Sequence, residues 1–335
     1  MRRCLELCLA VLLIASPLFG QNVPEIPFDS VPNFLKLPAY VYLGEAVGVA
    51  QNSKGHIFVF TRSGETRLFE FDQNGNFVRE IAPHLYAWAF AHTVRVDSED
   101  NIWAIDEGSN MIVKFNPQGT KVLMTLGRKP ESAEGDTPGG FNYHPPVAGA
   151  PPPAAQPGAF NRETDVAWDP AGNILVSDGY GNSRVAKFDK DGRFITSVGT
   201  RGKEPNQFNT PHTIATDAKG NVYVGDRGNS RIQVFDNDLV LRGIWTGFGA
   251  PWAICITPGP RQYLYTSDSV PGQVYKLDME GHVLGKFGTA GKQLKQFGWI
   301  HEINCTSENE LLVGEILNWR VQKLLLHPET QVSRK

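Results

Sequence analysis

Short runs of alternating apolar and polar residues repeat along the chain between residues 47 and 326. One copy contains four such runs, at Thr164–Asp169, Asn173–Asp178, Ser183–Phe188 and Phe194–Val198. Alternation over so few residues is typical of a half-buried β-strand. Dipeptides such as Ala171-Gly172 and Asp191-Gly192 separate the runs and favour tight turns. Each copy is therefore predicted to form four short antiparallel strands.

Six copies of this pattern follow one another. Their opening positions are Val47, His92, Thr164, His212, Trp252 and His301, spaced by 45, 72, 48, 40 and 49 residues. Four short antiparallel strands at such intervals are typical of a blade, so we predict an all-β, six-bladed β-propeller. The sixth copy ends near Leu326 without an outermost strand. We expect residues Ala39–Leu43, ahead of the first blade, to supply that strand and close the ring.

The segments outside the repeats predict export. Arg2 and Arg3 precede a short apolar run, Leu7–Ala15, which indicates a signal peptide over residues 1–20 and a periplasmic or extracellular protein. No later apolar run is long enough to span a bilayer. The expected division is an N-terminal extension at 21–37, the propeller at 38–328 and a tail at 329–335. A Pro- and Gly-rich insertion at 128–159 is either a lid or a solvated surface loop.

The net charge of the chain excludes some classes of binding partner. The formal net charge of −3 provides no basic surface for nucleic acid or an anionic membrane, so small molecules or peptides are the expected partners. A closed propeller gives no strong reason to oligomerise, and we expect a monomer.

Two cysteines, Cys255 and Cys305, lie in the chain after the expected signal peptide. We expect two buried free thiols rather than a disulfide between them.

Histidine opens every second copy of the repeat, at His92, His212 and His301. In a ring of six blades these three imidazoles would lie about 120° apart and converge on the axis. Each would otherwise bury a polar ring without a partner. Zn²⁺ binds three imidazoles and keeps a fourth position open in catalytic sites. The pattern predicts a metal site.

A second set of polar residues shares the face of the histidines. The first strand of a blade begins, and the second strand ends, at the same face. Arg62, Glu107, Tyr180 and Arg227 lie at the ends of second strands. Glu302 follows His301 and is expected to point away from it in a regular strand. We therefore expect one polar mouth around the histidines.

These residues, with their neighbours, resemble the peptidyl-α-hydroxyglycine α-amidating lyases, six-bladed propellers of the NHL-repeat class. The resemblance covers nearly the whole chain after residue 20 and rests on the motifs around Arg62, His92-Thr-Val, Asp178-Gly-Tyr180, Pro211-His212, Asp226-Arg227 and Ile300-His301-Glu302. It implies catalytic zinc on His92, His212 and His301, with Arg62, Tyr180 and Arg227 contacting the substrate or taking part in the reaction. It also implies a structural Ca²⁺ on the carbonyl groups of Val49 and Val94 and on Glu302, where the family typically has aspartate.

Three functions remain open at this point. The first is a zinc-dependent lyase that splits an N-acyl or peptidyl α-hydroxyglycine into a primary amide and glyoxylate. In that reaction Tyr180 would transfer a proton, as a phenolate favoured by a nearby cation, and Arg62 or Arg227 would bind the carboxylate. The second is an exported, non-catalytic NHL propeller that binds a protein or glycan. The third, a calcium-dependent lactonase-like hydrolase, is disfavoured because its axis would be expected to use acidic and amide ligands.

Overall fold

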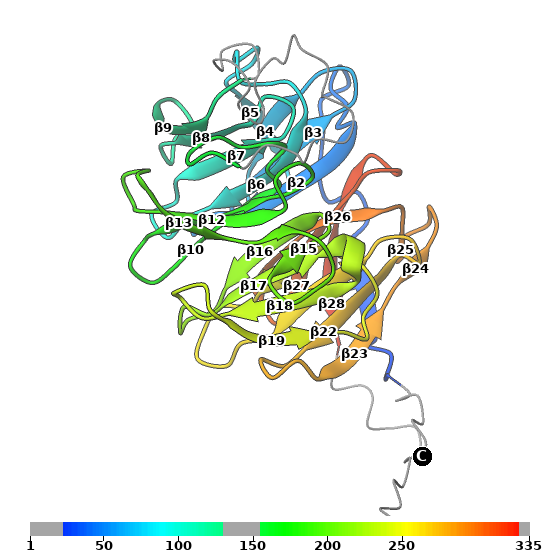
Figure 1. Cartoon of the computed structure of the whole chain (residues 1–335). Helices are drawn as coiled ribbons and strands as arrows, with labels where there is room; N and C mark the ends of the chain where they lie inside the picture. Colours follow the sequence, from blue (N-terminus) through cyan, green and yellow to red (C-terminus); the bar gives the residue numbers. More distant parts are fainter. Residues whose placement is uncertain (1–22, 130–154, 328–335) are drawn as a thin grey trace, which may run out of the picture.

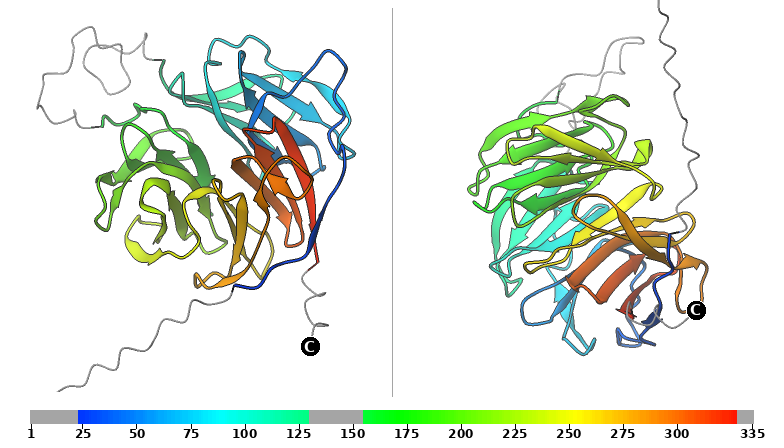
Figure 2. Two further views of the ribbon diagram at one scale, coloured as in Figure 1. Left: turned by 90° about the vertical axis from the view of Figure 1, so that its right-hand side faces the viewer. Right: turned by 90° about the horizontal axis from the view of Figure 1, so that it is seen from below.

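The computed structural model describes residues 23–129 and 155–327. Within these ranges the strands form six four-stranded antiparallel sheets around a ring, which confirms the predicted six-bladed propeller (Figures 1 and 2). The expected signal peptide, most of the insertion and the tail at 329–335 lie outside the described residues and stay predictions. In the described part of the chain, no helix has the length and apolarity needed to cross a membrane.

The first three blades each use four consecutive strands. Blade one contains β2 (Glu45–Gln51), β3 (Ile57–Arg62), β4 (Arg67–Phe71) and β5 (Phe77–Ile81). Blade two contains β6 (Ala91–Val96), β7 (Ile102–Asp106), β8 (Met111–Phe115) and β9 (Val122–Gly127). Blade three contains β10 (Asp165–Trp168), β11 (Ile174–Asp178), β12 (Arg184–Phe188) and β13 (Phe194–Val198).

Blades four to six follow the same order, with additions. Blade four contains β16 (Pro211–Thr216), β17 (Val222–Asp226), β18 (Arg231–Phe235) and β19 (Leu241–Trp245), with the 3₁₀ turn η2 (Arg227–Asn229) after β17. Blade five contains β20 (Pro251–Ile256), β21 (Leu264–Asp268), β22 (Gln273–Leu277) and β23 (Val283–Phe287). Blade six contains β26 (Ile300–Ser307), β27 (Glu310–Glu315) and β28 (Arg320–Leu326). Two short parallel pairs, β14 (Thr200–Arg201) with β15 (Gln207–Phe208) and β24 (Thr289–Ala290) with β25 (Gln296–Phe297), precede blades four and six.

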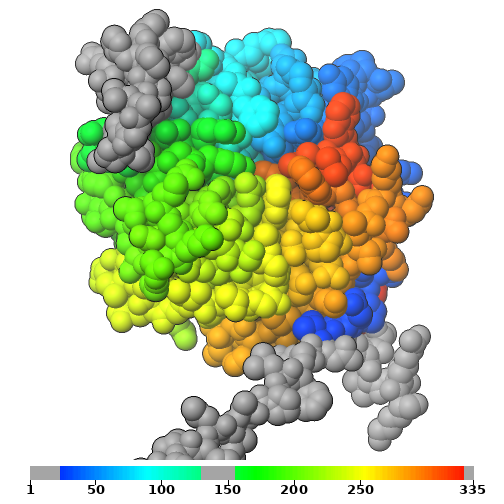
Figure 3. Space-filling view, turned by 45° about the vertical axis from the view of Figure 1, so that its right-hand side comes forward, coloured from blue at the N-terminus to red at the C-terminus, as the bar shows by residue number. Residues whose placement is uncertain are grey.

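The ring is closed by a strand earlier in the chain than the one we predicted. β1 (Phe28–Ser30) pairs antiparallel with β28 as the outer strand of blade six, so the expectation for Ala39–Leu43 was wrong. The buried side chains of Val41 and Leu43 pack between blades six and one, but Val41 N donates to the carbonyl of Pro38 in a turn. In Figure 3 the N-terminal segment, in blue, lies against the orange part of the chain.

Six hydrophobic clusters lie between neighbouring blades of the described protein. Phe60 of blade one packs with Val94 of blade two in one cluster, and Val59 packs with Leu312 of blade six in another. Full burial of such a side chain contributes about 1.5–3 kcal/mol. The repeat therefore folds as a ring because a blade has apolar side chains on both faces and needs a neighbour on each side.

Bulges interrupt the inner strands at the opening positions. In blade two, Ala91 pairs with Asp106 and Thr93 pairs with Ile105, so His92 is the extra residue. His212 and His301 occupy the same place in their blades, where the register also shifts. A bulge re-aims a side chain and breaks the strict alternation of a strand. The local fold therefore presents all three histidines in the same way.

Cys255 and Cys305 form a disulfide, so the prediction of two free thiols was wrong. The two residues are 50 apart in sequence, but β20 and β26 lie side by side along the channel and bring their Cα atoms to 5.9 Å. That separation is within the range of natural disulfides. The bond joins blades five and six.

Removal of this disulfide is expected to lower the free energy of unfolding by about 2–4 kcal/mol, because the bond restricts the unfolded chain over a long loop. The double variant Cys255→Ala with Cys305→Ala should show this loss in urea denaturation. The wild-type protein in a phosphine reductant should show the same loss. An unchanged denaturation midpoint under reduction would argue that the bond contributes nothing to stability.

Candidate metal centre and surrounding site

The three opening histidines meet on the axis of the propeller. Their ring centroids are 4.6 Å apart for His92 and His212, 4.6 Å for His92 and His301, and 4.9 Å for His212 and His301. One nitrogen from each ring lies within 4.8 Å of the other two. All three side chains are buried. Their inner strands β6, β16 and β26 lie near the middle of the molecule in Figure 1.

The backbone of the next blade orients two of the rings. His212 Nδ1 lies 2.7 Å from the carbonyl oxygen of Trp252, and His301 Nδ1 lies 2.7 Å from that of Val47. A carbonyl oxygen can only accept, so each Nδ1 carries the proton and each Nε2 presents a lone pair. Among the described residues, Nε2 of all three histidines has no hydrogen-bond partner. Buried polar atoms without partners are rare, and three that converge fit a metal ion.

The environment keeps the three imidazoles neutral. Burial is the largest cause that lowers the pKa of His92, His212 and His301 well below the usual value. The guanidinium group of Arg227 lowers the pKa of all three further, and that of Arg62 lowers the pKa of His92 and His301. A neutral imidazole is the form that binds a metal. The protein therefore favours the form of the three imidazoles that can bind a metal.

Tyr180 lies beside the histidines, as predicted. Its ring centroid is 5.9 Å from that of His92 and 6.0 Å from that of His212. Arg227 donates to the Tyr180 hydroxyl oxygen at 3.4 Å. Burial nevertheless raises the pKa of Tyr180, although Arg227 acts in the opposite direction. We had expected the cation to favour a phenolate, whereas the structure favours a protonated phenol.

The two arginines predicted at the mouth differ in their partners. Arg62 Nε donates to Glu45 Oε2 at 2.8 Å, and its Nη1 lies 3.4 Å from Glu107 Oε1. Arg227 makes no ion pair with a carboxylate among the described residues, and its guanidinium lies 4.3 Å from the centre of the Trp252 ring. Arg62 is therefore already paired, whereas Arg227 is available to an anionic ligand.

Several residues around the site were not predicted. Arg162 pairs with Glu107 at 3.2 Å and covers the ring of Tyr180 at 4.7 Å. Glu163 is fully buried, and neither of its carboxylate oxygens has a hydrogen-bond partner in the described protein. Burial raises the pKa of Glu163 well above its usual value. Both residues follow the insertion and precede the third opening position, where no repeated motif marks them.

Two tryptophans form an apolar wall next to the histidines. Trp252 is the opening residue of blade five, and its ring lies 5.2 Å from His212 and 6.1 Å from His301. Trp299 lies 5.7 Å beyond it and is 39% exposed. The sequence signal for Trp252 is its opening position in the repeat, which it shares with the three histidines. The wall could contact an apolar part of a ligand bound at the mouth.

Glu302, expected as a calcium ligand, is already bound by protein groups. Glu302 Oε1 lies 3.1 Å from Arg95 Nη1 and accepts from the backbone N–H of Ile303 at 2.9 Å, while Oε2 accepts from the Thr93 hydroxyl. Protein donors thus hold both carboxylate oxygens. Val49 and Val94, whose carbonyl groups the resemblance also implied, lie in β2 and β6, and their role as calcium ligands stays a prediction. The bulge at His301 also invalidates the simple alternation on which we based the direction of Glu302.

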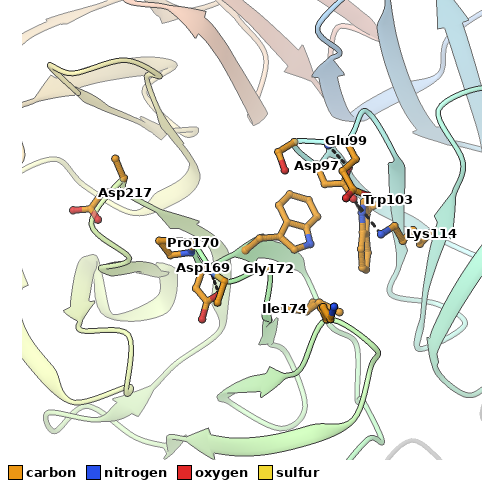
Figure 4. Close-up of a pocket in the computed structure, with 14 residues that line it drawn as sticks. Asp97, Glu99, Trp103, Lys114, Asp169, Pro170, Gly172, Ile174 and Asp217 are labelled. Carbon is orange, nitrogen blue, oxygen red and sulfur yellow. Dashed lines mark hydrogen bonds and ion pairs between the residues drawn. The ribbon is translucent and has the colours of Figure 1, made fainter.

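A cavity of about 730 Å³ lies at the other ends of the inner strands, between the turns of blades two, three and four (Figure 4). Two of its carboxylates are already engaged: Asp97 accepts from Trp103 at 2.9 Å and pairs with Lys114 at 3.3 Å, and Asp169 pairs with Lys187 at 3.0 Å. The same kind of aspartate turn joins the first two strands of blades two, three and four. We therefore assign the functional site to the histidine face instead.

Comparisons with known proteins agree with the repeat. The NHL repeat model matches residues 208–235. The probable peptidyl-alpha-hydroxyglycine alpha-amidating lyase pgal-1 of Caenorhabditis elegans is 25% identical over 85% of this chain and 83% of its own length. The peptidyl-glycine alpha-amidating monooxygenase of Mus musculus is 27% identical over 92% of this chain, which spans 33% of that longer protein.

Among solved structures, the virginiamycin B lyase of Staphylococcus aureus superimposes with a TM-score of 0.60 at 12% sequence identity, over 90% of this chain and 100% of that one. This likeness concerns the fold. The sequence relatives include proteins named for the family that the histidine, tyrosine and arginine motifs resemble. The chain is thus a six-bladed NHL-type β-propeller, and peptidyl-alpha-hydroxyglycine alpha-amidating lyases are among its sequence relatives.

Proposed function

We propose that this protein is a zinc-dependent lyase that cleaves an N-acyl or peptidyl α-hydroxyglycine to a primary amide and glyoxylate. The observation that carries the proposal is the convergence of three unpartnered histidine nitrogens beside Tyr180 and Arg227. Three imidazoles with an open fourth position are a donor set typical of catalytic zinc. The names of the sequence relatives support the same reaction.

Arg227 and the tryptophan wall would position the substrate. The unpaired guanidinium of Arg227 would bind the substrate carboxylate, with the two groups forming parallel hydrogen bonds. Trp252 and Trp299 would contact the acyl group. Arg62 remains paired with Glu45 and Glu107 and would raise the positive potential at the histidines. The structure thus favours Arg227 over Arg62 as the carboxylate ligand, a choice that the sequence left open.

Tyr180 would move the proton that the reaction requires. The C–N bond breaks with its electron pair going to nitrogen, and the carbinol C–O bond becomes the C=O bond of glyoxylate. The protonated phenol of Tyr180 would donate to the departing nitrogen and recover a proton from the substrate hydroxyl, so the net transfer is from oxygen to nitrogen. A bound Zn²⁺ would supply the Lewis acidity that lowers the pKa of that hydroxyl.

The test is an assay with N-benzoyl-α-hydroxyglycine and zinc-loaded protein, in which released glyoxylate is measured against the spontaneous rate. We expect zinc-dependent release that is lost after treatment with a chelator and restored by added Zn²⁺. Zinc content should be measured on the same samples. Fully zinc-loaded protein that releases no glyoxylate above background would contradict the proposal and favour a non-catalytic NHL propeller.

A further inference from the structure

One residue of the channel wall differs from its counterparts in size and charge. Three positions after the opening residue, five blades have small or medium side chains, namely Ala50, Ala167, Ala215, Cys255 and Asn304. Blade two has Arg95 at this position. The side chain of Arg95 is only 13% exposed. At this position the smaller side chains of the other five blades leave space, and the guanidinium of Arg95 occupies it.

Arg95 contacts carboxylates from two other blades. Its Nε donates to Asp165 Oδ1 at 2.8 Å, and its Nη2 donates to Asp165 Oδ2 at 2.6 Å. On its other side, Nη1 lies 3.1 Å from Glu302 Oε1. Asp165 and Glu302 each occupy the position directly after the opening residue, in blades three and six. The guanidinium of Arg95 thus connects blades two, three and six, through carboxylates that lie one residue after the opening positions.

Two threonines complete an oxygen-rich layer at this level. Thr93 donates to Glu302, and the Thr213 hydroxyl donates to Asp165 Oδ2 at 2.9 Å. The side chains of Asp165 and Glu302 are 1% and 3% exposed. Two carboxylates removed from water at one level need a cation, because neither their desolvation nor their mutual repulsion is otherwise offset. Carboxylate and hydroxyl oxygens are also the ligands that Ca²⁺ prefers.

We propose that the guanidinium of Arg95 is a built-in cation of the channel, which does the structural work of a bound divalent ion by holding Asp165 and Glu302 together beneath the histidines. The wild-type fold then needs no calcium. Removal of the guanidinium creates a divalent-cation site from Asp165, Glu302, Thr93 and Thr213. This inference does not rest on the proposed lyase reaction.

Thermal denaturation with and without Ca²⁺ tests the proposal, with one equivalent of Zn²⁺ in every sample. The wild-type melting temperature should not respond to millimolar Ca²⁺. The variant Arg95→Ala should melt lower than wild type without Ca²⁺, and saturating Ca²⁺ should raise its melting temperature by roughly 5 °C. Mg²⁺ should have a smaller effect, because it loses its water ligands reluctantly.

Matched variants identify the site. Adding Asp165→Asn to Arg95→Ala should abolish the calcium response. Arg231→Ala removes another buried arginine, paired with Asp226 at 2.7 Å, and should lower stability without creating a calcium response. Saturable stabilisation of wild type by Ca²⁺ would overturn the proposal. So would an Arg95→Ala variant that ignores Ca²⁺, or one that fails to fold even in its presence.

Discussion

Replacement of His212 by alanine is expected to remove zinc from the protein and to lower kcat/KM by at least about 10³-fold. The side chain is one of three converging imidazoles, and its loss leaves two, which is too few for a stable zinc site. Zinc per chain should fall from about one to well below one. Metal analysis and the glyoxylate assay on the same preparation measure both effects.

His282→Ala is the matched control for this prediction. That side chain is 76% exposed and bonds to Asp278 in a turn of blade five. The His282→Ala variant should keep the zinc content and the rate of glyoxylate release of the wild-type protein. Circular dichroism must show that His212→Ala is folded, since the ring also donates to the carbonyl of Trp252. A folded His212→Ala protein with full zinc content would mean that the metal, if bound, lies elsewhere.

The sequence predicted the ring and the convergence of three histidines for the same physical reason. Each repeat has the alternation of a strand and the glycines of a turn, both of which are local signals. A ring of six copies then places His92, His212 and His301 on alternate blades, and this placement does not depend on where each strand begins or ends. Arg62, Tyr180 and Arg227 could be placed at the same mouth because strand direction alone decides the face.

Features that depend on packing between distant segments could not be predicted. Ala39–Leu43 alternates as a strand would, yet β1 occupies the edge of blade six, where Phe28 packs on Phe287. Cys255 and Cys305 pair because two inner strands lie side by side, which no spacing in the sequence reveals. In both cases the local pattern was compatible with two arrangements, and tertiary contacts selected one.

The bulges had the largest consequence for the site. A regular strand would turn His301 and Glu302 to opposite sides, and the prediction for Glu302 followed from that rule. The register shift at His301 removes the rule, and Arg95 and Thr93 then engage the carboxylate. The roles of the arginines likewise depend on partners such as Glu45, which lies in a different strand from Arg62.

Tyr180→Phe is expected to lower kcat by about 10²–10⁴-fold with little change in zinc content or KM, because only the proton-transferring hydroxyl is removed. Phenylalanine keeps the ring that lies against His92 and His212 and beneath Arg162. It also keeps the backbone, since both residues can occupy the observed φ of 30° at similar cost. Steady-state kinetics with N-benzoyl-α-hydroxyglycine, together with zinc analysis, measure the effect.

Tyr42→Phe provides the comparison, because Tyr42 is 58% exposed and stacks on Trp319 with its ring centroid 6.1 Å away. Its kcat should match wild type. A rise in KM without a fall in kcat for Tyr180→Phe would show that the hydroxyl acts through Arg227 to bind the carboxylate. An unchanged kcat and KM would show that Tyr180 does not transfer the proton, and solvent would then be the proton donor. Burial raises the pKa of Tyr180, so the proposed role uses the protonated phenol and not the phenolate.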